Sequence, residues 1–167
     1  MGDIHWDIFP RKAKRERLNI SNFSIYIIVE QKEDKYIYQL EMKVRDYECD
    51  LQGIVNNANY QHYLEHTRHE FLSSIGASFS DLHNQGIDPV VARINIAFKI
   101  PLKSGDEFIS KLYLKKEGIK YVFFQDIFRK SDNKVAIKAT VDTVCLENGR
   151  LTDSELFRKI FASYLLQ

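Results

Sequence analysis

Residues 45–76 contain a long helical pattern that directly follows an acidic, glycine-containing loop. One set of side chains recurs there at steps of three and four residues: Tyr60, Leu64, Thr67, Phe71 and Ile75. This spacing predicts a helix that begins near Asn57 and buries one face. Gly76 follows the stripe and suits a helix C-terminal cap. A helix with such a stripe needs a partner layer that covers it.

Polar side chains surround the start of the predicted helix. Asn56, Asn57 and Asn59 are of the type that caps helix N-termini, and Asp50 lies in the loop just before them. Free backbone N–H groups at a helix start can stabilise an oxyanion, and a nearby carboxylate can attack a carbon centre or activate water. This stretch is therefore a candidate catalytic site.

The rest of the chain mostly alternates in the manner of strands. Residues 36–45 predict a strand with one buried face, and residues 77–89 predict a loop with about one helical turn. Four predicted strands and a terminal amphipathic helix follow: 90–100, 108–116, 119–129, 135–146 and 154–166. Because short turns separate the strands, we expect antiparallel neighbours and an α+β fold with a helix on one face of a sheet.

Three short motifs connect this stretch to a known family. The chain reads Asp-x-x-Gly-Ile-Val from Asp50 to Val55, Asn-Asn-Ala-Asn-Tyr from Asn56 to Tyr60, and YLEHTR in the helix. This pattern resembles hotdog-fold acyl-CoA thioesterases, in particular the 4-hydroxybenzoyl-CoA thioesterase-like branch. The resemblance covers residues 36–151 and implies a hotdog fold, an antiparallel five-stranded sheet wrapped around a long central helix.

The resemblance also implies roles for individual residues. Asp50 matches the aspartate that attacks the thioester or activates the hydrolytic water, and the Asn57 backbone N–H matches the amide that polarises the thioester carbonyl. We expect four more residues to bind substrate: Gly53, Val55, Asn56 and Tyr60. Helix capping by Asn56 and core packing by Tyr60 are competing explanations. No metal or cofactor is expected, because a thioester carbonyl is already electrophilic.

The chain departs from the family pattern at two positions. Members of this branch often carry a histidine where this chain has Asn57, and a related set carries one at the position of Ile54. Without either histidine, Asp50 and the backbone donors would carry the reaction, which predicts slow turnover or a restriction to activated thioesters. Basic residues should contact the phosphates of coenzyme A, and the candidates by composition are Arg93, Lys99, Lys103 and Lys120.

Several residues of the stretch allow other interpretations. Asp50 can cap its own loop through backbone N–H groups. Glu65 matches a second hotdog branch that uses a helix carboxylate, although a surface ion pair with Arg68 or His69 is the simpler interpretation. The side of the helix that carries these three residues lies off the apolar stripe, so we expect it to face water.

Metal and thiol chemistry have weaker support from the sequence. His62, His66 and His69 lie at helical spacing, but the pattern lacks the further ligand of a typical helix-borne metal site. Cys49 adjoins Asp50, yet no matched histidine is present to deprotonate its thiol. We therefore expect no metal site and no cysteine nucleophile.

Composition limits the number of domains, the kinds of partner and the cellular compartment that we expect. A chain of 167 residues, 44% hydrophobic and 28% charged, predicts one soluble domain with a sizeable core. The formal net charge of +1 favours neither nucleic acid nor a membrane as partner. Cys49 and Cys145 form no recognisable framework, which fits a reducing compartment, and no apolar run reaches about 18 residues. We expect a cytoplasmic protein.

The chain divides into three parts on this basis. Residues 1–35 form an N-terminal extension with a basic run, and a solvated arm, a nucleic-acid tail and a hairpin pairing residues 23–30 with the strand from Tyr36 remain open for it. Residues 36–151 form the predicted hotdog domain, and residues 152–167 form the terminal helix.

The predicted function and assembly follow from the resemblance. Acyl-CoA is the expected substrate, with acyl-acyl carrier protein hydrolysis and a non-catalytic acyl-binding role as alternatives. Hotdog proteins place their active sites between two subunits. Residues 119–129 carry apolar side chains on both faces of the predicted strand, which favours a homodimer or homotetramer.

Overall fold

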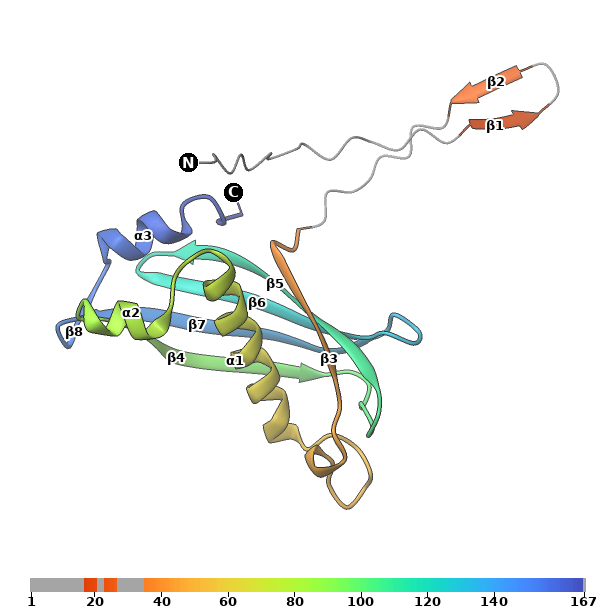
Figure 1. Cartoon of the computed structure of the whole chain (residues 1–167), viewed down its shortest axis with the longest axis horizontal. Helices are drawn as coiled ribbons and strands as arrows, with labels where there is room; N and C mark the ends of the chain where they lie inside the picture. Colours follow the sequence, from red (N-terminus) through yellow and green to blue (C-terminus); the bar gives the residue numbers. More distant parts are fainter. Residues whose placement is uncertain (1–16, 21–22, 27–34, 167) are drawn as a thin grey trace, which may run out of the picture. The chain divides into compact units, whose positions relative to one another are not determined.

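A computed structural model of the chain describes residues 17–20, 23–26 and 35–166 (Figure 1). The chain divides into two compact units, Met1–Asp34 and Lys35–Gln167. In the first unit, β1 (Arg17–Ile20) pairs antiparallel with β2 (Phe23–Tyr26). The hairpin considered for residues 23–30 lies partly outside the described residues; within them, β2 pairs with β1.

One curved antiparallel sheet dominates the second unit. Its five main strands stand in the order β3-β5-β6-β7-β4. Their bounds are β3 (Tyr38–Lys43), β4 (Ile87–Phe98), β5 (Glu107–Glu117), β6 (Lys120–Arg129) and β7 (Val135–Glu147). The short strand β8 (Arg150–Thr152) pairs with the end of β7. The sequence did not predict β8, although the Asn148-Gly149 turn before it has the positive φ angles of a tight hairpin.

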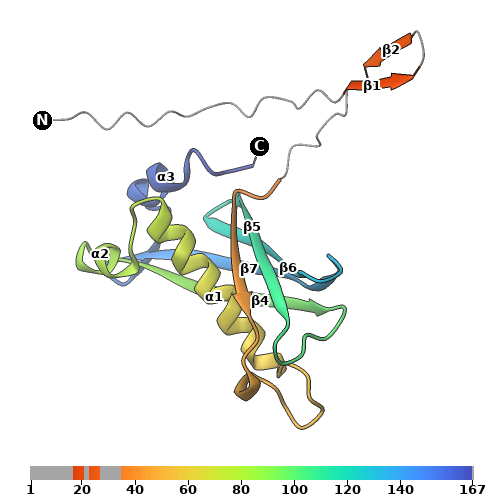
Figure 2. The ribbon, with the colours of Figure 1, turned by 45° about the vertical axis from the view of Figure 1, so that its right-hand side comes forward.

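One long helix, α1 (Asn57–Ser74), lies across one face of this sheet (Figures 1 and 2). It begins where the sequence predicts, because the Asn56 side chain accepts a hydrogen bond from the Ala58 N–H at 3.0 Å. It ends just before Gly76, whose φ is +74°. The predicted α+β architecture, an antiparallel sheet around a long central helix, is confirmed.

The buried face of α1 is wider than the predicted stripe. Its buried residues are Tyr60, Tyr63, Leu64, Thr67, Arg68, Phe71 and Leu72. The expectation that Arg68 faces water is wrong, because its guanidinium donates a hydrogen bond to the Gln125 side-chain oxygen of β6 at 2.9 Å. A curved sheet contacts the flanks of a helix as well as its centre, so positions beside the stripe become buried too.

Two clusters of buried hydrophobic side chains form the core, one near each end of α1. Near the helix end, Phe71 packs with Phe161 of the terminal helix, with ring centroids 6.2 Å apart. Near the helix start, Tyr63 packs on Phe108 of β5, with ring centroids 4.7 Å apart. Leu64 belongs to this second cluster and has no exposed surface. The two clusters fix both ends of α1 on the sheet.

The terminal helix is shorter than predicted. It was expected over residues 154–166, whereas α3 spans Glu155–Phe161 with Ser154 as its N-cap. Beyond α3 the chain extends, and the Leu166 N–H donates to the Leu114 carbonyl of β5 at 3.0 Å. Backbone pairing with the sheet therefore replaces the last predicted turns of helix.

The segment before β4 is more regular than predicted. A short helix, α2 (Phe79–Asn84), supplies the expected turn, and Ser78 caps it by accepting from the Asp81 N–H at 3.0 Å. β4 then begins at Ile87, earlier than the predicted residue 90. In the described part of the chain, no helix is both long and apolar enough to cross a membrane.

We predict that Leu64→Ala lowers the free energy of unfolding by about 2–5 kcal/mol, because it leaves a cavity between α1 and the sheet. Gln61→Ala, at an exposed position of the same helix, is the matched control and should change stability by less than about 0.5 kcal/mol. Urea unfolding at one protein concentration measures both. Equal stability of the two variants would contradict this packing.

Candidate functional site

The acidic loop before α1 closes on itself through its backbone. An isolated antiparallel bridge joins Cys49 to Val55. Inside it, the Asp50 N–H donates to the Ile54 carbonyl and the Gly53 N–H donates to the Asp50 carbonyl, each at 2.9 Å. Gly53 has a φ of +73°, a backbone conformation that residues other than glycine rarely adopt. The glycine thus allows the turn that presents Asp50.

The Asp50 side chain contacts its own loop. Its Oδ1 accepts a hydrogen bond from the Gln52 N–H at 2.9 Å, which is the loop-capping role considered as an alternative to catalysis. When the Gln52 amide nitrogen points toward Asp50, it lies 3.0 and 3.2 Å from the two carboxylate oxygens. A carboxylate has about four acceptor sites, so these contacts leave room for water or substrate. The capping role and a catalytic role are compatible.

The start of α1 leaves one backbone donor without an acceptor. The Asn56 side chain caps the Ala58 N–H, and the Asn59 N–H donates to the Asn56 carbonyl at 2.9 Å. Among the described residues, no acceptor lies within hydrogen-bond distance of the Asn57 N–H. The Asn57 side chain is exposed. Since helix N-termini carry a partial positive charge, this N–H can donate to a developing oxyanion.

A cleft of about 360 Å³ brings the loop and the helix start together. Its lining residues come from the loop, from α1 and from the end of β4: Asp50, Ile54, Val55, Asn57, Tyr60, Phe98, Lys99, Ile100 and Pro101. Four of the predicted site residues therefore share one cleft. Gly53 and Asn56 do not line it; the first shapes the loop and the second caps the helix.

The sequence did not predict which residues form the wall of the cleft opposite the Asp50 loop. Phe98, Ile100 and Pro101 form it, and Phe98 is 53% exposed. Alternation in the strand pattern had placed Phe98 and Ile100 on one apolar face, so a weak signal was present. Nothing in the local pattern joins the end of this strand to the Asp50 loop, because that contact depends on the closure of the whole sheet.

Tyr60 connects α1 to this wall. Its hydroxyl oxygen accepts a hydrogen bond from the Leu102 N–H at 3.2 Å, and its ring meets Phe98 edge-on with centroids 5.4 Å apart. The side chain is 3% exposed, as core packing predicts. Burial raises the pKa of Tyr60 above its usual value, so the phenol stays protonated at neutral pH. Its geometric role is to hold the cleft wall against the helix.

A short 3-10 turn, η1 (Asp46–Glu48), is held against α1 by a buried carboxylate. The Tyr63 hydroxyl donates to Glu48 at 2.7 Å. The Glu48 carbonyl accepts from the Asn56 N–H at 2.9 Å and from the Asn59 side-chain amide at 2.7 Å. Burial, and then the hydrogen bond to Glu48, raise the pKa of Tyr63 well above its usual range. The loop and the helix start therefore move as one piece.

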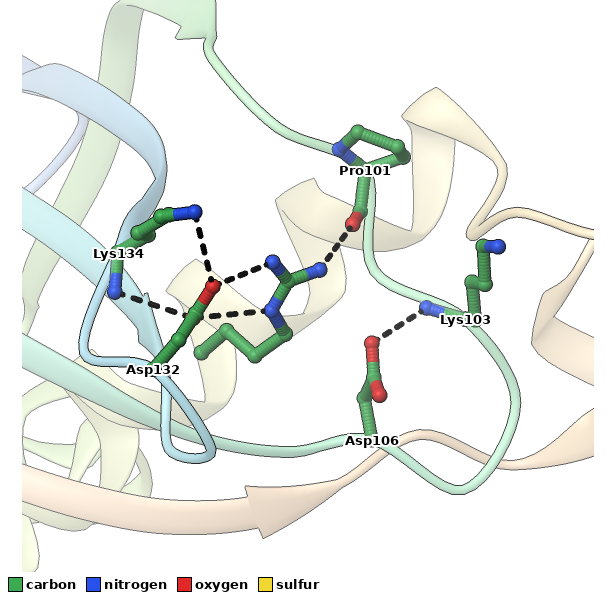
Figure 3. A network of polar contacts seen from close by, with 6 residues as sticks. Pro101, Lys103, Asp106, Asp132 and Lys134 are labelled. Atoms are coloured by element: carbon green, nitrogen blue, oxygen red, sulfur yellow. Dashed lines mark hydrogen bonds and ion pairs between the residues drawn. The ribbon is translucent and has the colours of Figure 1, made fainter.

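An ion-pair network holds the chain segment that follows β4 (Figure 3). Arg129, at the end of β6, donates to both carboxylate oxygens of Asp132 at 3.0 and 2.7 Å, and to the Pro101 carbonyl at 3.5 Å. The Lys134 amine lies 3.5 Å from the same carboxylate. The hydrogen bonds from Arg129 hold the pKa of Asp132 well below its usual range. This clamp positions Pro101 in the cleft wall.

The alternative carboxylate, Glu65, does not line the cleft of Asp50. It lies 3.9 Å from His69, and both side chains are about half exposed. Arg68, the other expected partner, bonds to Gln125 instead. The surface-pair interpretation of Glu65 therefore agrees with the structure, and such a pair contributes little stability.

The other candidate chemistries find no support in the geometry. His66 lies 3.9 Å from Glu70 on the exposed side of α1. Within the described ranges, no three His, Cys, Asp or Glu side chains lie close enough together to hold a metal ion. The Cys49 thiol contacts the Arg45 carbonyl at 4.0 Å, and no described histidine bonds to it.

The four basic residues considered for contacts with coenzyme A phosphates differ in whether they line the cleft of Asp50. Lys99 lines the cleft, whereas Arg93 and Lys103 do not. Lys120 already contacts Asp142 at 2.9 Å and Glu117 at 3.8 Å. Lys99 is therefore the best placed of the four to meet a substrate anion at the cleft mouth.

Comparison with known proteins identifies relatives. The profile of the Thioesterase-like superfamily matches residues 44–159. A chloroplastic acyl-acyl carrier protein thioesterase of Arabidopsis thaliana is 36% identical over 112 residues, 66% of this chain and 59% of the relative. The long-chain acyl-CoA thioesterase FadM of Escherichia coli is 30% identical over 110 residues, 65% of this chain and 83% of the relative.

The fold also matches a solved structure. A 1,4-dihydroxy-2-naphthoyl-CoA thioesterase of Synechocystis superposes with a TM-score of 0.69 at 15% identity, covering 75% of this chain and 95% of that one. At this identity the likeness concerns the fold alone. The chain spans about three fifths of the length of the Arabidopsis relative, so the activity of that longer protein does not transfer directly.

We predict that Asp132→Asn loosens the cleft wall in a pH-dependent way. The pKa of Asp132 is depressed in the folded state, so its clamp stabilises the fold above about pH 4 and loses that effect as pH falls further. Thermal unfolding should therefore separate wild type from Asp132→Asn at pH 7, and the difference should shrink steadily as pH falls from about 4 toward 2. A constant difference across this range would contradict the role of the ionised carboxylate.

Proposed function

The chain belongs to the Thioesterase-like superfamily, and we propose that it hydrolyses the thioester of an acyl-CoA to a free acid and coenzyme A. Its fold is the hotdog fold that the motif resemblance predicted. The single observation that carries the proposal is the shared cleft of Asp50 and Asn57, with the Asn57 N–H free to donate.

Asp50 supplies the attacking or activating group in this proposal. Its carboxylate either bonds to the thioester carbon or takes a proton from the water that does so. The carbon–sulfur bond then breaks, and the sulfur leaves as a thiolate that takes up a proton. If Asp50 attacks directly, water cleaves the resulting anhydride and restores the carboxylate. Both routes consume one water and release one acid and one thiol.

The Asn57 N–H supplies the oxyanion donor. Negative charge moves to the carbonyl oxygen as the carbon becomes tetrahedral, and a preorganised donor at a helix start stabilises that charge. The partial positive charge of α1 favours the same position. Because the donor belongs to the backbone, the identity of the side chain at residue 57 matters less than the presence of its N–H.

No histidine is among the described residues that line the cleft beside Asp50. Ile54 contributes an apolar side chain, and the Asn57 side chain does not titrate. A base without an acid partner depends on a good leaving group, and a thiolate leaves more readily than an alkoxide. We therefore retain the expectation of slow turnover or of a preference for activated thioesters.

We also propose that the working enzyme contains at least two copies, as a homodimer or a homotetramer. β4 lies at the edge of the sheet, with Val91 46% exposed and Phe98 53% exposed. Phe98 also lines the cleft, so a second copy on this edge would shield the cleft from water. Light scattering that gave one chain per particle for the active enzyme would exclude this assembly.

Acyl-acyl carrier protein is the second candidate substrate. It is favoured by the 36% identity to a plant enzyme named for that activity. The cleft chemistry would be the same, because only the carrier differs. Hydrolysis of the carrier-protein thioester with no hydrolysis of the matching acyl-CoA would select this alternative.

A cytoplasmic location stays a prediction from the sequence, since the Arabidopsis relative is named as chloroplastic.

We predict that Asp50→Asn lowers kcat/KM for acyl-CoA at least about 100-fold. The variant should fold normally, because an asparagine oxygen can still accept from the Gln52 N–H. Asp46→Asn, in the exposed turn before it, is the matched control and should retain activity. Free thiol release from short, medium and long acyl-CoAs measures all three proteins.

The other outcomes of this experiment are informative. Activity that survives Asp50→Asn would move the chemistry to Glu65 or to a water held elsewhere. A wild type that cleaves neither acyl-CoA nor acyl-acyl carrier protein would favour a non-catalytic acyl-binding protein.

We predict that Asn57→Pro lowers kcat about 100- to 1,000-fold, because proline removes the N–H that would bind the oxyanion. Proline is tolerated at the first position of a helix, and the preceding Asn56 has the extended backbone (ψ 137°) that proline requires. Asn57→Ala keeps the N–H and should lose little activity. If both variants lose activity equally, with unfolding unchanged, the side chain and not the amide is responsible.

A further inference from the structure

A second cleft, which we call the far cleft, lies further along α1. It has a volume of about 280 Å³ and lies between α1, the first part of β4 and the terminal helix. Most of its wall is apolar, including Leu72, Phe79 and Phe123. Two buried polar side chains, Arg68 and Thr143, also line it. The proposed reaction uses neither of them.

Arg68 is an unusual wall residue because it is charged and only 7% exposed. One of its nitrogens donates to the Gln125 oxygen at 2.9 Å, and the Gln125 nitrogen is itself bonded to the Leu64 carbonyl at 3.0 Å. No carboxylate of the described residues lies within ion-pairing distance of Arg68. Burial lowers the pKa of Arg68 to about 10, so it stays charged at neutral pH. A guanidinium has five N–H donors, and one hydrogen bond leaves most of them unused.

Thr143 adds a buried, unpaired hydroxyl to the far cleft. Its side chain is 5% exposed, and its hydroxyl is buried without a hydrogen-bond partner among the described residues. Buried polar groups are usually paired, since an unpaired one costs free energy. An unpaired hydroxyl and a guanidinium with further N–H donors, in the wall of one mostly apolar cleft, indicate a ligand that is mostly apolar and carries an oxygen.

The far cleft and the cleft of Asp50 lie in a row between the same two elements. The first takes Arg68 and Leu72 from α1 and Val91 from β4, whereas the second takes Asn57 from α1 and Phe98 from β4. The cleft lined by later residues of α1 is lined by earlier residues of β4, and the reverse holds for the other cleft. The two elements therefore run in opposite directions past both clefts. An acyl chain whose thioester lies at Asn57 can therefore run along α1 toward Arg68.

The helix sets the length of that path. Asn57 and Arg68 are eleven residues apart, or about 16 Å at about 1.5 Å per residue. Helical side chains point back toward the N-terminus, so the guanidinium lies on the order of 10 to 16 Å from the thioester position. An extended chain of roughly eight to thirteen carbons spans this distance.

We propose that the far cleft binds the distal part of the acyl group, and that Arg68 selects acyl chains that carry a hydroxyl or carbonyl oxygen there. This inference rests on the proposed thioester hydrolysis for the placement of the chain. A neutral oxygen fits better than a carboxylate, because Glu65 also lines the far cleft and its charge acts on Arg68. An unsubstituted alkyl chain would cover the Arg68 donors without pairing them.

The experiment compares acyl-CoAs of equal length with and without a terminal hydroxyl, from roughly eight to fourteen carbons. Wild type should prefer the hydroxylated member of the best-matched pair by about tenfold or more in kcat/KM, the effect of one hydrogen bond to a charged group. Arg68→Met, which keeps an apolar side chain of similar length, should abolish or invert that preference. Thr143→Val should weaken it.

The control variant is Thr140→Val, at a partly buried threonine on the other face of β7, and it should keep the wild-type preference. If Arg68→Met does not fold, the wild-type comparison and Thr143→Val still decide the question. Equal kcat/KM for both members of every pair would overturn the inference while leaving the proposed hydrolysis intact.

Failure of the proposed function is measured separately. If wild type cleaves no acyl-CoA, calorimetry of the corresponding free acids tests the far cleft without any chemistry. Tighter binding of the hydroxylated acid, lost in Arg68→Met, would support the inference. Binding that is independent of the hydroxyl would refute it.

Discussion

The arrangement of the Asp50 cleft depends on how one acidic residue, Glu48, joins the loop to the start of α1. Its carboxylate accepts hydrogen bonds from the Tyr63 hydroxyl and the Arg45 N–H, each at 2.7 Å, and its carbonyl accepts two more from the first helical turn. A buried carboxylate is stable only when it is paired in this way. Loss of any partner would therefore move the Asp50 loop relative to the Asn57 N–H.

The sheet imposes the second constraint, because its curvature decides which side chains of α1 are buried. Leu64 and Phe71 fill the centre of the interface, while Arg68 lies on its flank with Gln125 as partner. Burying a guanidinium without an ion-pair partner costs free energy, which a single hydrogen bond to a neutral acceptor offsets only in part. Its presence in a mostly apolar wall is the observation behind the proposed selection of an oxygen-bearing acyl chain.

Local sequence signals predicted the parts of this protein that local physics determines. The capping asparagines, Gly76 and the apolar stripe fix α1 without reference to the rest of the chain, and the motif around Asp50 indicated the cleft. The burial of Glu48 and Arg68 was not predictable, because it depends on partners far away in the sequence, Tyr63 and Gln125. The early end of α3 has the same origin, since the sheet offers its backbone a competing partner.

Because the proposed oxyanion donor is a backbone N–H, the proposed mechanism requires neither of the two helper histidines that this chain lacks. A side-chain donor is lost with one substitution, whereas the Asn57 N–H persists for every residue except proline. The proposed chemistry then depends on Asp50 and on the helix start, both of which the loop and cap hydrogen bonds fix. The proposed site thus separates reactivity, which would depend on Asp50 and a backbone N–H, from selectivity, which would depend on residues such as Arg68.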